Sequence, residues 1–202
     1  MTDGIRPALI LASASPRRID LLRQIGIVPD RIEAAALDES PRQNESPRGC
    51  VARLARMKAE VVAERCESPA LVLGADTIVA VGRRILPKAE DRATAESCLR
   101  MLSGRRHTVL TAVSLVPSAH WPEGRMAERL VETAVTFSRL SEAQLNALLD
   151  QGDWAGKAGG YALQGAAASV IRYVGGSPSG VIGLPLFETA QLLRGQKARF
   201  LP

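Results

Sequence analysis

Near its start the chain has a short apolar run followed by a polar loop and a helix start, and this pattern constrains the fold more than any other feature of the sequence. Residues 8–12 (ALILA) are apolar enough to form a buried strand. Ser15 and Pro16 are the residue types of an N-cap and a first helical position, and Gly26 is a typical helix end. A strand that passes through a polar loop into a helix predicts an α/β protein. Such a loop also leaves backbone N–H groups free to bind an anion.

Helices and strands alternate irregularly along the rest of the chain. We expect helices over residues 47–65, 89–102, 142–152 and within 183–195, and strands over 71–75, 108–116, 130–137 and 167–174, with a hairpin at 78–86. Ser141 and Gln144 have the spacing of a capping box. Because hairpins interrupt the alternation, the pattern predicts a mixed sheet in a single domain over residues 1–202.

Composition and charge exclude several classes of protein. No apolar run approaches the roughly 20 residues of a membrane helix, and none resembles a signal peptide, so we expect an uncleaved cytoplasmic protein. The three cysteines are far apart, which argues against a zinc site. A net charge of +5 permits binding to nucleic acid, but the basic residues form scattered pairs and only 3% of residues are aromatic. A small polyanion is therefore the better candidate ligand.

Two segments carry side chains suited to phosphate chemistry. Ser13, Arg17 and Arg18 surround the first helix start, where hydroxyls and guanidinium groups bind phosphate oxygens; a capped helix with solvated arginines explains them equally well. Asp76 and Thr77 directly follow the apolar run 71–75, which predicts that they lie at the carboxyl edge of the sheet. Asp76 is suited to hold a metal or to accept a proton from water, although a turn aspartate is the simpler explanation.

Three further charged residues and one loop are candidates. Lys88 precedes the acidic start of a predicted helix, where a cation is disfavoured unless an anion compensates it. Lys58 lies on the apolar side of its helix and either extends to water or meets phosphate or Asp76, with Glu39 as a further charged candidate. The glycine-rich stretch 157–165 contains Gln164, whose amide is suited to a base edge, but it is not a Walker A loop and is equally explained as a surface loop. His107 and His120 have no partner nucleophile, so a hydrolase triad is not expected.

The order of these segments resembles the Maf family of nucleotide pyrophosphatases. The segments LASASPRR, VARLARMKA, LGADTIV, ILPKAED, MLSGRRHTV, KAGGYALQG and GLPL follow the order of that family and cover nearly the whole chain. The resemblance implies an elongated fold similar to inosine triphosphate pyrophosphatases, with helices on both sides of a mixed sheet and a cleft between two lobes. It implies a divalent cation, Mg²⁺ or Mn²⁺, and a nucleoside triphosphate as the partner. A homodimer is left open, and neither nucleic acid nor a membrane is expected.

The resemblance also assigns roles to single residues. It implies that Asp76 is the catalytic proton acceptor, assisted by Lys58 and Lys88, and that Glu39 and Asp76 hold the metal. Ser13, Arg17 and Arg18 would bind phosphate. Arg17, Thr77 and Gln164 match the branch that acts on dTTP and UTP rather than 7-methyl-GTP. Cys50, where the family has tyrosine, and the 117–129 loop depart from the pattern.

The expected reaction is in-line attack of water on the α-phosphorus, with pyrophosphate leaving as one unit. Two other functions remain open at this point. The family is associated with septum formation, so one alternative is a regulator of cell division that binds nucleotides without meaningful turnover. If the chain is an active enzyme, its cellular role is either control of division or removal of modified nucleotides from the nucleotide pool. The pI of about 9.6 leaves nucleic-acid binding as the other alternative.

Overall fold

The structure is a computed structural model that describes residues 6–201, and a long mixed sheet forms its centre. Its strand order is β2-β1-β3-β6-β7-β9, with β4 paired to β3 and a separate pair β5-β8. The elements in chain order are β1 (Ala8–Ala12), α1 (Pro16–Gln24), β2 (Arg31–Ile32), α2 (Pro47–Glu64), β3 (Ala70–Val81), β4 (Arg84–Leu86), β5 (Lys88–Ala89), α3 (Arg92–Leu102), β6 (Arg106–Pro117), β7 (Ala127–Phe137), α4 (Glu142–Gln151), β8 (Lys157–Ala158), a 3₁₀ turn (Ala166–Ser169), β9 (Ile171–Gly175), α5 (Pro178–Ile182) and α6 (Leu186–Arg194).

Parallel and antiparallel pairs share this sheet, which confirms the predicted mixed α/β class. The strand β1 pairs in parallel with both β2 and β3, whereas β3, β6, β7 and β9 pair antiparallel in succession. A short loop joins β6 to β7, whereas α3 lies in the connection between β3 and β6 and α4 in that between β7 and β9; the parallel pair β1–β3 is joined through α1 and α2. Among the helices of residues 6–201, none combines the length and apolar composition needed to cross a membrane.

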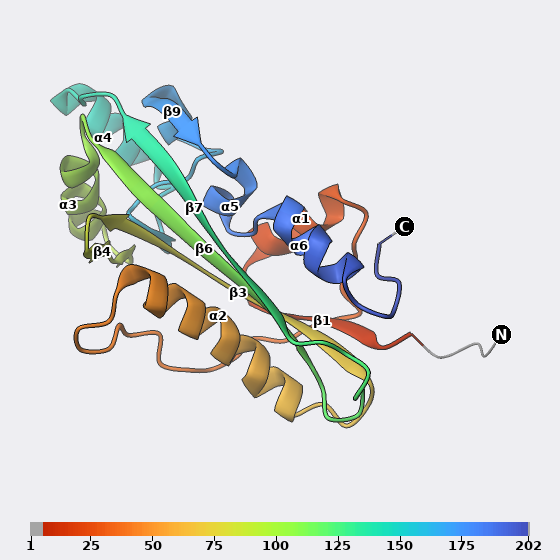
Figure 1. Cartoon of the computed structure of the whole chain (residues 1–202). Helices are drawn as coiled ribbons and strands as arrows, with labels where there is room; N and C mark the ends of the chain where they lie inside the picture. Colours follow the sequence, from red (N-terminus) through yellow and green to blue (C-terminus); the bar gives the residue numbers. More distant parts are fainter. Residues whose placement is uncertain (1–5, 202) are drawn as a thin grey trace.

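Helices cover both faces of the long strands β3, β6 and β7 (Figure 1). The helix α2 packs on one face, against even-numbered positions of β3 such as Ile78 and Ala80. The opposite face carries two separate cores. The α1–α6 core contains Leu22, Leu73 and Leu193, and the α3–α4 core at the other end of the strands contains the residues Val79, Leu99, Phe137 and Leu149. Each core buries one end of the same strands, so the two cores share one sheet.

Threonines separate the two cores on this face. Thr77 of β3 is paired with Thr111 of β6, and Thr133 of β7 lies on the α3–α4 side of them. The short helix α5 covers this polar strip. Thr111 donates to the carbonyl of Gly180 at 2.7 Å, and the backbone N–H of Ser177 donates to Thr133 at 3.0 Å. Burying these hydroxyls is tolerated because each of them has a hydrogen-bond partner.

Most of the predicted elements are confirmed, and Ser15 is the N-cap residue of α1 as predicted, although its side chain makes no capping hydrogen bond. Ser141 and Gln144 form the capping box, and Ser46 caps α2 at the predicted start. Four details are wrong. The runs 71–75 and 78–81 belong to one 12-residue strand, β3. The third helix begins at Arg92 with Asp91 as its N-cap, because Lys88 and Ala89 pair with β8. The segment 167–174 begins as a 3₁₀ turn, and α5 was not expected.

His107 is buried inside the α3–α4 core. Its ring is 2% exposed and packs edge-on against Phe137 and Tyr161, with Nε2 2.8 Å from the Tyr161 hydroxyl. The Nδ1 atom has no hydrogen-bond partner among the described residues. Burial lowers the pKa of His107 to about 4, because the charged imidazolium would lose its hydration there.

The neutral state of His107 predicts a specific loss of stability in mild acid. The unfolded chain takes up a proton near pH 6.5, whereas the folded protein does so only near pH 4, so stability falls as the pH drops through this window. We expect His107 to account for about 2 kcal/mol of the stability lost between pH 7 and pH 5. Urea unfolding at both pH values should show a smaller loss in His107→Gln, and equal losses in the two proteins would contradict this assignment.

Candidate active site

The main cavity lies at a gap along one edge of β3. On that edge β3 pairs with β1 only as far as Gly74, and with β4 only from Val79. Side chains from both faces of the strand therefore reach the opening between them. The cavity has a volume of about 460 Å³, which suits a ligand the size of a nucleotide.

All of the residues predicted for the site line this one cavity. They are Ser13, Arg17, Arg18, Glu39, Lys58, Asp76, Thr77, Lys88 and Gln164. The parallel register of β1 and β3 explains why the segment that follows β1 lies next to Asp76. Ala12 is opposite Gly74, so Ser13 leaves β1 just where β3 continues toward Asp76. Asp76 thus lies in the middle of a strand, at the carboxyl end of β1 rather than of β3.

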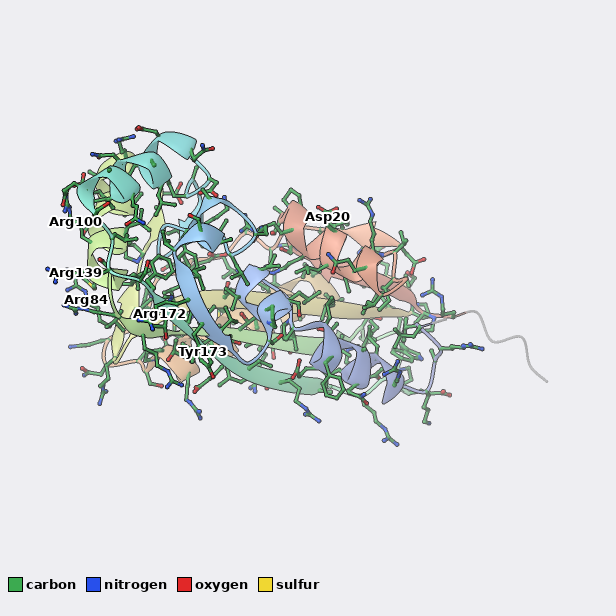
Figure 2. The ribbon with its side chains drawn as sticks, turned by 90° about the horizontal axis from the view of Figure 1, so that it is seen from above. Asp20, Arg84, Arg100, Arg139, Arg172 and Tyr173 are labelled. Atoms are coloured by element: carbon green, nitrogen blue, oxygen red, sulfur yellow. The ribbon has the colours of Figure 1, made fainter. Side chains whose placement is uncertain are left out.

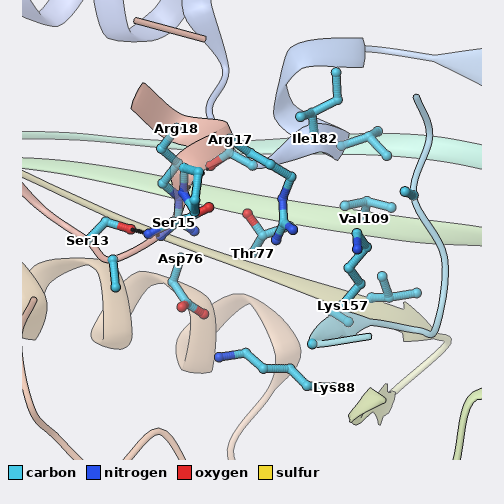
Figure 3. Close-up of a pocket in the computed structure, with 18 of the residues that line it drawn as sticks. Ser13, Ser15, Arg17, Arg18, Asp76, Thr77, Lys88, Val109, Lys157 and Ile182 are labelled. Carbon is cyan, nitrogen blue, oxygen red and sulfur yellow. Dashed lines mark hydrogen bonds between the residues drawn. The ribbon is translucent and has the colours of Figure 1, made fainter. Parts of the chain in front are cut away.

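Four charged side chains form a continuous chain of ion pairs. Lys58 Nζ lies 2.6 Å from Asp76 Oδ1 and 2.6 Å from Glu39 Oε1, and Glu39 also contacts Lys88. Asp76 and Lys58 are buried, with 4% and 7% of their surface exposed, whereas Lys88 is largely exposed. Asp76 and Lys88 extend into the same space (Figure 3). Lys58 thus meets Asp76, which was one of the two alternatives left open for it.

Glu39 is held as a carboxylate by this arrangement. Burial raises the pKa of Glu39, but its hydrogen bonds and charge interactions with Lys58 and Lys88 outweigh that effect and lower the pKa to about 2. The prediction for Lys88 rested on an incorrect reason. Lys88 is not in a helix start but in β5, and its partner is Glu39. The helix dipole of α3 therefore does not explain its position.

The serine–arginine motif has two distinct parts. Arg18 is buried, and its Nε donates to the Gly183 carbonyl at 2.8 Å while Nη1 donates to Ser13 Oγ at 3.0 Å. Burial lowers the pKa of both arginines. Arg18 therefore fixes the loop before α1 against the turn that follows α5. Arg17, at the mouth of the cavity, extends toward the ligand space (Figure 3).

Thr77 and Asp76 reach the cavity from opposite faces of β3. Asp76 faces α2, while Thr77 faces α5 and bonds to Thr111. The lining beside Thr77 is mainly apolar and includes the side chains Val79, Val109, Tyr161, Ala162, Val181 and Ile182. Gln164 is exposed at the rim. The cavity therefore has the Asp76–Lys58–Glu39 ion pairs on the α2 side and an apolar lining on the α5 side, beside which the cations Arg17 and Lys157 lie (Figure 3).

Lys157 lines the cavity but was not predicted as a site residue, although it belongs to the glycine-rich stretch 157–165. It lies in β8, next to β5, and burial together with the charge of Arg17 lowers its pKa. Arg17 and Lys157 approach each other from different elements (Figure 3), and two facing cations form a good site for an anion. The glycines after Lys157 had suggested a flexible loop, and its pairing with residues 88–89 was not visible in the sequence.

The carboxylates fit a metal ion that is shared with a substrate. Across residues 6–201, no group of three or more metal-ligating side chains comes together. Glu39 and Asp76 supply two carboxylates, both in contact with Lys58. Mg²⁺ commonly binds through one or two carboxylates with waters and substrate phosphates. The donor set therefore suits binding that is completed by phosphate oxygens.

Known proteins resemble this chain over most of its length. Residues 8–196 match the family described as Maf-like protein. A dTTP/UTP pyrophosphatase of Gluconobacter oxydans is 68% identical and covers 95% of this chain and 88% of its own; that of Caulobacter vibrioides is 55% identical and covers 94% and 95%. Among solved structures, the Staphylococcus aureus Ham1 protein covers 64% of this chain and 71% of its own at 15% identity, with a TM-score of 0.43.

Gly74 allows the close approach of α2 that brings Lys58 to Asp76. A Cβ atom at Gly74 would lie 2.2 Å from the carbonyl oxygen of Ala55 and 2.8 Å from the backbone nitrogen of Ala59. We expect Gly74→Ala to displace α2, lower the free energy of unfolding by about 1–3 kcal/mol and weaken ligand binding. Gly195→Ala is the matched control, because its Cβ would meet only ordinary contacts. Equal urea midpoints for the two variants would show that the strand and helix can separate without cost.

Proposed function

The chain belongs to the Maf family, and from this premise we propose that it hydrolyses dTTP and UTP to the nucleoside monophosphate and pyrophosphate. Relatives that are 51–68% identical to it are named dTTP/UTP pyrophosphatases. The observation that carries the proposal is a buried carboxylate, Asp76, in a nucleotide-sized cavity that also contains several lysines and arginines. We further propose a cytoplasmic location, as the composition predicts.

The two sides of the cavity suit the two ends of a nucleotide. The triphosphate fits the charged side, where Lys58 and Lys88 lie near Asp76, with Arg17 and Lys157 at its margin. The base fits the apolar side between Val109 and Ile182. Cations bind phosphate oxygens strongly in a partly buried site, where the charge interaction is less screened than in water.

Asp76 is the proposed general base. It lies on the phosphate side of the cavity, with its Oδ1 2.6 Å from Lys58 Nζ. A carboxylate at this point can orient a water molecule for in-line attack on the α-phosphorus and accept its proton as the bond forms. Lys58 and Lys88 then stabilise negative charge on the phosphate oxygens. Arg18 and Ser13 act indirectly, because their mutual hydrogen bond holds the loop before α1.

A divalent cation, Mg²⁺ or Mn²⁺, is part of the proposal. Glu39 and Asp76, which both contact Lys58, would hold it together with the triphosphate. When bound, such an ion neutralises charge on the phosphates and on the leaving pyrophosphate. The pKa of about 2 for Glu39 keeps this ligand ionised throughout the neutral pH range.

Three residues are proposed to select the base. Thr77 lies beside the apolar lining, and Arg17 and Gln164 stand near the mouth of the cavity. Their hydrogen-bonding groups surround the space in which a pyrimidine would lie. The identity of the relatives supports uracil and thymine as the bases.

Removal of the proposed base tests the assignment of Asp76. We expect Asp76→Asn to lower kcat for pyrophosphate release from dTTP and UTP by at least about a hundredfold, because asparagine cannot accept the proton. Asp20→Asn, on the outer side of α1 (Figure 2), is the control and should retain the wild-type rate. Near-wild-type turnover by Asp76→Asn would remove Asp76 from the reaction.

Metal dependence gives a second, independent test. We expect chelation by EDTA to abolish pyrophosphate release and added Mg²⁺ or Mn²⁺ to restore it. Glu39→Gln should raise the metal concentration needed for half-maximal activity by about tenfold, since an amide oxygen carries no charge to offset the cation. Isothermal titration of Mn²⁺ in the presence of dTMP and pyrophosphate measures the same loss without turnover. Full activity in EDTA would contradict a metal in the mechanism.

A further inference from the structure

A buried threonine behind the cavity determines how Thr77 can hydrogen-bond. Thr111 lies opposite Thr77 in the β3–β6 ladder and is 1% exposed. Its hydroxyl oxygen is 2.7 Å from the carbonyl oxygen of Gly180 and 3.0 Å from the hydroxyl oxygen of Thr77. Thr111 itself does not line the cavity, so any effect it has on a ligand passes through Thr77 or through α5, whose Val181 and Ile182 do line it.

Counting hydrogens assigns a direction to these two contacts. A threonine hydroxyl has one hydrogen and can accept further hydrogen bonds through its lone pairs. The carbonyl of Gly180 can only accept, and among residues 6–201 Thr111 is the one group that donates to it. The Thr111 hydrogen therefore belongs to the shorter contact, since a buried carbonyl left without a donor would be costly. The contact between the two hydroxyls is then satisfied by the hydrogen of Thr77.

This assignment leaves Thr77 with lone pairs, and no hydrogen, for the cavity. A ligand that bonds to its oxygen must then present a donor. Uracil and thymine carry an N3–H group, whereas cytosine has a bare nitrogen at the same position. Gln164 cannot make this distinction, because its amide offers both a donor and an acceptor and can turn to suit either base. The role of Thr77 as a hydrogen-bond acceptor is thus fixed before the substrate binds.

We propose that Thr111 is a positioning residue for substrate choice. Its oxygen accepts the hydrogen bond from the Thr77 hydroxyl, so Thr77 can only accept from the ligand and selects pyrimidines that present an N3–H donor. The proposal rests on the proposed function, because it assumes that the base lies beside Thr77. It extends that function to a residue outside the cavity, and it predicts that UTP and dTTP are both accepted in preference to CTP. The same hydroxyl also anchors α5, so a purely structural role is the alternative to be separated.

The test is the ratio of kcat/KM for UTP to that for CTP, measured by pyrophosphate release. Loss of one oriented hydrogen bond corresponds to about a tenfold change. We therefore expect the ratio to fall by about tenfold in Thr111→Val, which removes the hydroxyl at nearly constant volume. Thr111→Ser keeps the hydroxyl and should keep the ratio. An unchanged ratio in folded Thr111→Val would overturn the proposal.

A double-mutant cycle separates positioning from structure. In Thr77→Val the acceptor is absent, so the ratio should already be low, and Thr111→Val should lower it no further in that background. An equal additional drop there would mean that Thr111 acts only through α5, which overturns the proposal. If Thr111→Val does not fold, Thr111→Ala takes its place. A wild-type ratio in Thr77→Val would also overturn the proposal without any change at Thr111.

The outcomes also distinguish this proposal from the proposed function. A wild-type protein that releases no pyrophosphate from UTP or dTTP would contradict the proposed function itself. A wild-type protein that hydrolyses UTP and CTP equally well would leave the reaction intact and overturn only the role of Thr111. As a further probe, 4-thio-UTP retains the N3–H group and should follow UTP in every variant.

Discussion

The parallel register between β1 and β3 is the constraint on which the rest of the site depends. Because Ala12 is opposite Gly74, β1 ends just before β3 reaches Asp76, and β4 joins the same edge only at Val79. The uncovered stretch of strand lets Asp76 and Thr77, which point to opposite faces, serve one cavity. A shift of one residue in this register would exchange the two faces and direct Asp76 away from Lys58.

Burial of Lys58 between two carboxylates is the main electrostatic feature of the cavity. An isolated buried ammonium group would be strongly unfavourable, and Asp76 and Glu39 compensate it. The contacts with Lys58 and Lys88 lower the pKa of Glu39, and Arg17 and Lys157 face one another beside the apolar lining of the same cavity (Figure 3). The protein alone thus carries a charge pattern that a polyphosphate with its cation would complete. This argues for a site organised before the ligand binds.

The threonine strip between the two cores joins architecture to substrate choice. An apolar strip there would merge the α1–α6 and α3–α4 cores, whereas Thr77, Thr111 and Thr133 keep a polar floor under α5. These hydroxyls satisfy backbone groups of α5 and the preceding turn, so the polar floor is stable. The separation of the two cores and the polar floor under α5 therefore both come from threonines on neighbouring strands.

Local sequence patterns were enough to predict the starts of α1, α2 and α4, the alternation of strands and helices, and the residues of the charged motifs. These depend on local chemistry, such as caps and hydrophobic periodicity, which neighbouring residues carry. Three features became visible only in the folded chain: β3 continues through Asp76, Lys88 contacts Glu39 from a short strand, and Lys157 faces Arg17. Each of these depends on pairing between segments far apart in the chain. Such pairing is set by strand register and by the close packing of α2 on Gly74, and no local pattern encodes either one.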